Sequence, residues 1–224
     1  MAYTLRQLSS SAATDAEIDA VVKCLDAAFA EDHFTLVCIG GKPTSNGQVE
    51  ADLDLMYDWN KAPVIAALLA GEVHVAETFD HGISGAAVWF GPGQDLFGSE
   101  DQRDTALVPL LDKLSLELSQ WLETDFLPRY KNFTDNAFGS NTKTNSWHLQ
   151  CIGTIPEERG KGIATALIDV IRAKKGDVKM VLETETAENL KFYNKNGFEV
   201  KGEASFRGLH EGANFNMWAL VSRE

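Results

Sequence analysis

The sequence predicts a mixed α/β fold in which helices cover both faces of a mixed sheet. Stretches with strand and helix periodicity follow one another in the order β-α-α-β-β-α-β-α-β-α-β-β. Adjacent strands in this order can pair as hairpins, while each strand–helix–strand unit places a helix against a face of the sheet. The chain has 224 residues, of which 44% are hydrophobic and 24% are charged, and this composition is typical of a globular protein with a sizeable core.

The first half of the chain is expected to provide three strands and two helices. Thr14 or Asp15 can cap the first helix, whereas residues 31–58 are mixed in character and contain the turn-rich break "GGKPTSNG". In order, the expected elements are a strand at 3–8, a helix at 16–30, a helix at 62–71, a hairpin of strands at 72–79 and 83–91, and a loop at 91–104.

The second half is expected to begin with one long helix at 105–127, despite Pro109 near its start. Residues 128–146 are polar and predict an irregular segment. In order, the remaining elements are a strand at 147–155, a helix at 162–176, a strand at 179–186, a helix at 187–197, and strands at 198–206 and 214–222. The chain has no internal repeat and no low-complexity linker.

Charge and cysteine content narrow the function classes. A net charge of −13 argues against nucleic acid or an anionic membrane as the main partner, and it suits a cationic small molecule or a basic peptide. Acidity is also simply a route to solubility. Cys24, Cys38 and Cys151 fit neither a disulfide framework nor a zinc pattern, so we expect no metal. The sequence contains neither a signal-peptide pattern nor a run long enough to span a membrane, which predicts a cytoplasmic protein.

The stretch "TIPEERGKGIATALIDVI", residues 154–171, joins an expected strand to an expected helix through a turn with two glycines. The start of a helix presents unpaired backbone N–H groups and a partial positive charge, which together favour a phosphate group. Gly160 and Gly162 would let a phosphate approach the backbone closely, and Arg159 and Lys161 add positive charge. A plain tight turn would explain the same two glycines.

Two familiar phosphate-binding motifs do not fit this turn. The P-loop pattern G-x-x-x-x-G-K-[ST] is absent, and the dinucleotide pattern G-x-G-x-x-[GA] needs a small residue where the chain has Thr165. Residues 159–164 instead fit the pattern [QR]-x-x-G-x-[GA], which is the pyrophosphate-binding signature of the GNAT superfamily of acyl-CoA-dependent N-acetyltransferases.

A second segment of the chain resembles the same family. In GNAT enzymes an Asn precedes a Tyr by four residues, and a Gly-Phe pair follows; here these are Asn189, Tyr193, Gly197 and Phe198. Together the two motifs look most like the branch that includes puromycin N-acetyltransferase. The resemblance is strong over residues 145–200 and extends to the first 140 residues only through the order of the elements.

The resemblance implies a GNAT-like fold, with a mixed, mostly antiparallel central sheet of about seven strands and helices on both faces. It implies a single domain, 1–224, with an acceptor-side half at 1–140 and the acetyl-CoA-binding motifs at 145–205. The implied activity is transfer of the acetyl group of acetyl-CoA to the primary amine of a small molecule by a monomer or homodimer.

The family's binding residues carry over to particular positions of this sequence. The backbone of Ile152, Gly153 and Thr154 would pair with the pantetheine arm and the acetyl carbonyl, and Asn189 would contact the pantetheine. Tyr193, whose ordinary pKa is about 10, would approach the thiol sulfur and donate a proton to the leaving thiolate. The N–H groups that would hold the pyrophosphate belong to Arg159, Gly160, Lys161, Gly162, Ile163, Ala164 and Thr165.

The general base and the acceptor site are less well defined by the sequence. Glu183 is the first choice for the base because it lies near a strand end on the same face as Glu185, and His148 on the neighbouring strand is an alternative. Residues 29–58 and the hairpin at 207–214 are expected to line the acceptor site. Residues 91–104 and 129–146 are either lids or ordinary long loops.

Two sets of side chains could contribute to the acceptor site. The aromatic and apolar residues that could wall it are Phe34, Met56, Tyr57, Trp59, Trp89 and Phe90, and the acids that could attract a cation are Glu31, Asp32, Asp52, Asp54 and Asp58. None of them identifies a substrate. The alternatives to a small amine are a protein lysine or N-terminus as acceptor, or a CoA-binding sensor without catalysis.

Overall fold

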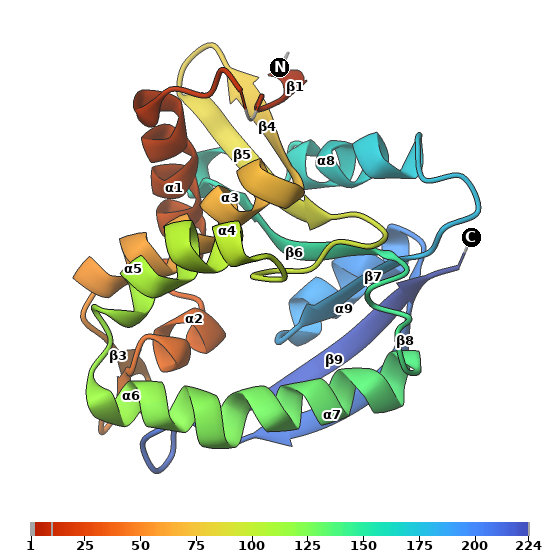
Figure 1. The fold of residues 1–224 in the computed structure, drawn as a ribbon. Coiled ribbons are helices and arrows are strands. Elements are labelled where there is room, and N and C mark those ends of the chain that lie inside the picture. The colour runs from red at the N-terminus through yellow and green to blue at the C-terminus, as the bar shows by residue number, and fades with distance from the viewer. Residues whose placement is uncertain (1–2, 10, 224) are drawn as a thin grey trace.

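A computed structural model describes residues 3–9 and 11–223 of the chain. Seven strands form one sheet in the order β1-β4-β5-β6-β7-β9-β8, and every neighbouring pair is antiparallel except β6–β7 (Figure 1). The strands are β1 (Tyr3–Gln7), β4 (Glu72–Thr78), β5 (Gly82–Phe90), β6 (Trp147–Thr154), β7 (Met180–Thr184), β8 (Phe198–Phe206) and β9 (Phe215–Ser222). The predicted mostly antiparallel sheet of seven strands is confirmed.

Helices cover both faces of this sheet because its strands alternate apolar side chains between the two sides. On β5, Ala87 and Trp89 pack on one side with α8 (Ile163–Arg172) and α9 (Ala187–Lys195). The side chains of Ala86, Val88 and Phe90 pack on the other side with α1 (Asp15–Phe29) and α3 (Asp54–Ala70). Thr14 caps α1 through a capping box with Glu17, as the sequence predicts.

The region between α1 and α3 contains small elements that the sequence did not reveal. These are α2 (His33–Cys38) and a two-stranded sheet of β2 (Lys42–Pro43) and β3 (Val49–Glu50). Helix α3 begins at Asp54 rather than at Ala62, and it continues through Pro63. The expected loop at 91–104 ends earlier, because α4 (Glu100–Gln102) starts within it.

The prediction of one helix at 105–127 followed by an irregular segment at 128–146 is wrong in two ways. The chain leaves the helix between Asp112 and Ser115, and a second helical stretch then continues to Phe138. Each stretch contains a π-helical turn immediately before a proline-containing segment. The segments are α4, Arg103–Leu107 (π) and α5 (Val108–Leu111), then α6 (Leu116–Trp121), Leu122–Phe126 (π) and α7 (Leu127–Phe138).

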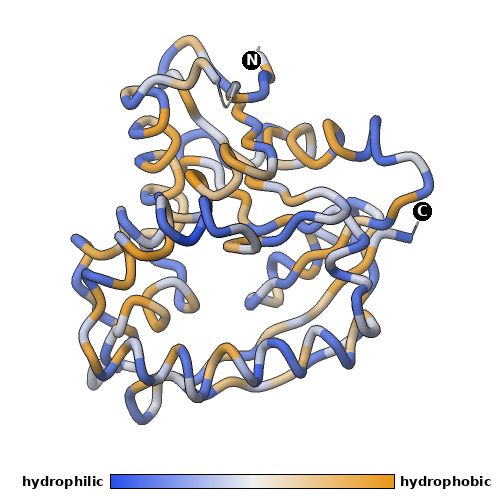
Figure 2. The backbone as a smooth tube through the Cα atoms, viewed as in Figure 1, coloured by the Kyte–Doolittle hydropathy of each residue, from blue (hydrophilic) through white to orange (hydrophobic). Residues whose placement is uncertain are grey.

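Helix α7 forms because its apolar residues lie on one side. Tyr130, Phe133 and Ala137 recur at helical spacing and pack against the sheet at β8 and β9. Figure 2 shows the alternation of apolar and polar residues along this helix. Pro128 lies in the first turn of α7, where a missing N–H is tolerated, so the proline does not end the helix. Gly139, with φ of 90°, ends it.

Strands β6 and β7 diverge after a short parallel contact, and this divergence positions the candidate site. Their pairing covers only residues 147–149 with 180–182. Beyond it, β6 continues to Thr154 paired with β5 alone, and β7 continues to Thr184 paired with β9 alone. We call the two diverging segments, 150–154 and 183–184, the β6–β7 fork. One edge of each segment has no strand partner in the described part of the chain, so backbone groups there are available to a ligand.

Candidate functional site

The turn between β6 and α8 presents backbone N–H groups in the way the sequence predicts. Gly160 and Gly162 have φ of 75° and 86°, a left-handed conformation that side chains with a Cβ rarely adopt. The first bond of the helix runs from the Ala166 N–H to the Gly162 carbonyl at 3.0 Å. The N–H groups of Ile163, Ala164 and Thr165 have no acceptor within residues 3–9 and 11–223.

The space above this turn is open. A Cβ built on Gly160 would meet no atom within 4 Å, and one built on Gly162 would meet only the Tyr3 hydroxyl, at 3.8 Å. The two glycines are therefore not small because protein atoms crowd them. Free N–H groups below an open space suit a pyrophosphate, which accepts several hydrogen bonds at once. The buried Thr154 Oγ1 at the end of β6 also lacks a hydrogen-bond partner in the described structure.

The basic side chains of the turn are engaged with the protein. Arg159 donates from Nη2 to the Ala28 carbonyl at 2.9 Å, which ties the end of α1 to the turn. Lys161 Nζ lies 3.1 Å from the carboxylate of Glu158, whose side chain is buried. Any contribution of this turn to phosphate binding therefore comes mainly from its backbone.

The fork places Ile152, Gly153 and Thr154 on the segment of β6 that has lost its β7 partner. Gly153 is also in close contact with α1, since a Cβ there would lie 2.7 Å from the Ala28 Cβ. This glycine thus lets α1 pack directly on the strand that forms one side of the fork.

Helix α9 starts immediately after the other branch of the fork and positions Tyr193. Thr186 caps the helix, Asn189 is exposed in its first turn, and Tyr193 lies four residues later on the same side. The Tyr193 ring is buried against Phe192 and Phe198, with ring centroids at 5.1 and 5.8 Å.

Burial raises the pKa of Tyr193 above its ordinary value, and the nearby Glu185, Cys151 and Glu183 raise it further. The phenol therefore stays protonated and can act as a hydrogen-bond donor at any working pH.

Glu183 forms a buried pair with His148 across the fork. Glu183 Oε2 lies 2.8 Å from His148 Nε2, and the side chains are 7% and 3% exposed. Burial raises the pKa of Glu183, but His148, Lys143 and a hydrogen bond from Tyr130 together lower it to about 2. Burial and the charge of Lys143 lower the pKa of His148, so we assign a neutral ring whose Nε2–H donates to the carboxylate.

Two atoms of this pair have no partner among the described residues. They are Glu183 Oε1 and His148 Nδ1, both fully buried. Because unpaired buried polar atoms cost free energy, each is a position at which a ligand or a water molecule would bind.

Two residues near this pair were not anticipated from the sequence. Tyr130, on α7, accepts a hydrogen bond from Lys143 Nζ at 2.7 Å and helps to lower the pKa of Glu183. Tyr130 and Lys143 both lie in the segment 128–146 that was expected to be irregular. The signal that would have placed Tyr130 is its helical spacing between Phe126 and Phe133.

Glu185 directly follows the end of β7, two residues after Glu183. It is partly exposed and has no ion-pair partner in the described structure. Burial raises its pKa well above the ordinary value, and the charges of Asp32 and Glu183 add to the effect. Asp32, the N-cap of α2, thus lies close enough for its charge to act on Glu185.

The expected acceptor-site residues do not form one wall. Phe34, Met56 and Trp59 share one cluster beside α7, Tyr57 and Phe90 belong to the cluster under α1, and Trp89 points to the opposite face of the sheet. The side chains of Trp89 and Phe90 cannot line the same wall, because successive residues of a strand face opposite sides of the sheet. Among the expected acids, Asp58 is paired with Lys113 at 2.6 Å, whereas Asp32 lies near Glu185.

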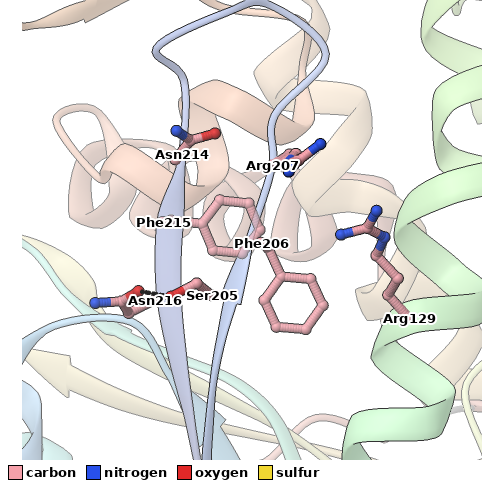
Figure 3. Close-up of a pocket in the computed structure, with 7 residues that line it drawn as sticks. All are labelled: Arg129, Ser205, Phe206, Arg207, Asn214, Phe215 and Asn216. Carbon is pink, nitrogen blue, oxygen red and sulfur yellow. Dashed lines mark hydrogen bonds between the residues drawn. The ribbon is translucent and has the colours of Figure 1, made fainter.

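A hollow of about 550 Å³ lies beside the ends of β8 and β9 (Figure 3). Arg129 extends towards it from α7, and the rings of Phe206 and Phe215, which also line it, stack on each other with centroids 5.3 Å apart. Neither Tyr193 nor Glu183 lines the hollow. Its two arginines, Arg129 and Arg207, do not favour a cationic amine, so we do not assign the acceptor site to it.

The part of the chain that the structure describes contains neither a cluster of metal-ligating side chains nor a helix that could span a membrane. Within residues 3–9 and 11–223, no group of three His, Cys, Asp or Glu side chains is arranged to hold a metal ion. None of the helices in those ranges combines the length and the apolar character needed to cross a membrane.

Comparisons with known proteins bear on both the motif region and the fold. Residues 132–200, from α7 to β8, match a family model described as an acetyltransferase (GNAT) domain. Three solved structures share the fold along nearly their whole length. The first, from Corynebacterium glutamicum, is described as histone acetyltransferase HPA2 and related acetyltransferase; it has a TM-score of 0.59 and 22% identity and covers 97% of this chain and 96% of that chain.

The other two comparisons are more distant in sequence. An N-acetyltransferase from Staphylococcus aureus has a TM-score of 0.57 and 15% identity, with coverage of 97% and 99%. A polyamine N-acetyltransferase from Drosophila melanogaster has a TM-score of 0.57 and 12% identity, with coverage of 98% and 99%. At these identities the structures establish the fold. The chain therefore has the GNAT fold, and the family match over residues 132–200 agrees with the GNAT resemblance of the motif region.

Proposed function

We propose that this protein transfers the acetyl group of acetyl-CoA directly to the primary amine of a small molecule, within a complex that holds both substrates. The observation that carries the proposal is the arrangement at the β6–β7 fork. Free N–H groups of the glycine turn and the Tyr193 hydroxyl belong to the α8–α9 side, while the carboxylates belong to the side of α2 and α7. The inner edges of the fork have no strand partner in the described part of the chain, so an amine could meet a thioester there without a covalent enzyme intermediate.

Acetyl-CoA supplies an activated acyl group as a thioester. The N–H groups of residues 159–165, chiefly those of Gly160, Gly162, Ala164 and Thr165, would hold the pyrophosphate. Ile152, Gly153 and Thr154 would pair through their backbone with the pantetheine arm, and Asn189 would contact it from α9. These assignments rest on the motif positions, together with the open space and the unpaired N–H groups at the turn.

On the amine side, Glu183 keeps its negative charge at neutral pH and attracts the ammonium group. After loss of one proton, the amine nitrogen bonds to the carbonyl carbon and the carbon–sulfur bond breaks. Tyr193 donates its proton to the departing sulfur and recovers one from the second N–H of the reacting amine through solvent. The net change converts an ammonium ion and a thioester into an amide, a thiol and one released proton.

The proposal is tested by calorimetric titration with acetyl-CoA, followed by an assay of thiol release with a panel of amines on the same sample. The panel includes agmatine and polyamines, since one fold neighbour is a polyamine N-acetyltransferase. We expect acetyl-CoA to bind and at least one small amine to accelerate thiol release. Binding without turnover on any amine or peptide would favour a CoA-binding sensor, and turnover only on peptides would favour a protein acetyltransferase.

A further inference from the structure

We propose that Glu185, rather than Glu183, removes the proton from the acceptor's ammonium group. This inference rests on the proposed function and specifies which residue of the site acts as the base. It follows from how differently the structure places two carboxylates that are two residues apart on one strand face.

Glu183 is poorly placed to exchange a proton with a substrate. Its side chain is 7% exposed, and one carboxylate oxygen already accepts a hydrogen bond from His148 at 2.8 Å. Tyr130, which accepts a hydrogen bond from Lys143, also favours the charged form of Glu183. A carboxylate stabilised in its charged form by these groups is a weak base, although it attracts cations.

Glu185 lies in a different position. It is the first residue after β7 and precedes Thr186, the N-cap of α9, so it stands at the open end of the fork. It is partly exposed, and no lysine, arginine or histidine of residues 3–9 and 11–223 pairs with it. Its carboxylate is therefore not engaged by a cation of the described chain.

The charge of Glu185 is coupled to Tyr193 of α9 and to Asp32, the N-cap of α2. Tyr193 is the proposed donor to sulfur, and Asp32 lies on the acceptor side. The titratable groups whose charges are coupled to it are Asp32 and Cys38 from α2, Tyr130 from α7, Glu183 from β7 and Tyr193 from α9.

None of these neighbours is a cation, and the negative charges of Asp32 and Glu183 disfavour ionisation of Glu185. Its affinity for a proton is thereby increased, as a general base near neutral pH requires. The unpaired Glu183 Oε1, which is fully buried nearby, is a second sign that a hydrogen-bond donor from outside the chain binds here.

In the proposed step, an N–H bond of the ammonium group breaks and an O–H bond forms on the Glu185 carboxylate. The nitrogen keeps its electron pair and becomes nucleophilic. The proton then passes from the Glu185 carboxyl group to solvent, which restores the carboxylate for the next turnover.

The test compares Glu185→Gln with the wild type, using the most active alkylamine of the panel at saturating acetyl-CoA. At neutral pH, where this amine is an ammonium ion, the variant should lose about a hundredfold or more in kcat/KM. Above the amine's own pKa the amine arrives already neutral and needs no base to deprotonate it. The deficit should then shrink to less than about tenfold.

Three further variants make the test specific. Glu185→Asp should restore part of the rate, because it keeps the carboxylate. Glu183→Gln should raise KM for the amine at neutral pH and leave kcat nearly unchanged, since its charge attracts the ammonium ion but takes no proton. Glu188→Gln removes the same charge from an exposed position three residues away and should behave as the wild type.

Acetyl-CoA affinity, measured by calorimetry, should be unchanged in Glu185→Gln, which verifies that the variant is folded. Wild-type activity in Glu185→Gln at neutral pH, or an equal deficit at all pH values, would overturn the inference while leaving the proposed function intact. A wild-type protein that turns over no amine would instead refute the proposed function, and the inference with it.

Discussion

Replacing Gly162 by Glu tests whether the glycine turn holds a pyrophosphate. The expected cost to the fold is small. A side chain at φ of 86° costs about 1–2 kcal/mol of backbone strain, but the new Cβ would have no protein neighbour nearer than 3.8 Å. A carboxylate at the start of α8 would recover about 0.3–1 kcal/mol from the helix dipole. The net loss is about 1 kcal/mol, or a fall in Tm of about 2–4 °C.

The expected cost to binding is much larger. A carboxylate about 4 Å from a phosphate charge, at an effective dielectric constant of about 20, is repelled by about 4 kcal/mol. Since about 1.4 kcal/mol is tenfold in affinity, acetyl-CoA should bind up to about a thousandfold more weakly. The same carboxylate would also compete for the N–H groups of Ile163, Ala164 and Thr165, which have no other acceptor among the described residues.

Gly162→Gln is the matched control, because it shares the strain and nearly the bulk but carries no charge. Calorimetric titration of both variants with acetyl-CoA, together with thermal melts, separates the charge effect from the effect on folding. We expect the Glu variant to bind at least about tenfold more weakly than the Gln variant. Equal affinities of the two variants, with melting temperatures close to the wild type, would refute the assignment of the pyrophosphate to this turn.

Three other predictions concern neighbouring parts of the site. Tyr193→Phe should lower kcat by about a hundredfold or more and leave acetyl-CoA affinity nearly unchanged, and an unaltered kcat would remove the proton-donor role. Gly153→Ala should lower the free energy of unfolding by about 1–3 kcal/mol in urea titrations, because its Cβ would lie 2.7 Å from that of Ala28; no loss would show that α1 shifts freely. Glu185→Gln should stabilise the protein at neutral pH. The folded-state pKa of Glu185 is raised above its unfolded value, so the wild type loses stability as pH rises between the two values while the variant does not. The opposite trend in urea titrations at several pH values would contradict this.

The sequence was most informative where one local rule determines the structure. The alternating patterns identify all seven strands of the main sheet, and Thr14 identifies the start of α1, because pattern and capping depend on neighbouring residues. The glycine turn could likewise be placed because its left-handed residues must be glycines.

The sequence was least informative where tertiary contacts decide. Pro128 suggests a break, but a proline in the first turn continues a helix, and packing of Phe133 and Ala137 against β8 determines that α7 forms. The short helix α2 has six residues and depends on its cap by Asp32 and on burial of Leu36 and Val37, which no local pattern reveals.

The same limit applies to the site. The strand pattern places Glu183 and Glu185 on one face but cannot distinguish their roles. The partners that distinguish them, His148 and Tyr130, come from distant parts of the chain. Trp89 and Phe90 belong to different clusters, as the alternation of side chains along a strand predicts, so the two residues cannot share one wall of an acceptor site.

The short contact between β6 and β7 has a consequence for how the molecule assembles. The strands on one side of it, β1, β4, β5 and β6, all come from residues 3–154, and those on the other side, β7, β8 and β9, all come from residues 180–222. The sheet thus consists of two consecutive portions of the chain joined by three residue pairs, with α7 of the first portion packed on β8 of the second. A substrate that occupies the fork would contact both portions, and its binding energy would also strengthen the joint between them.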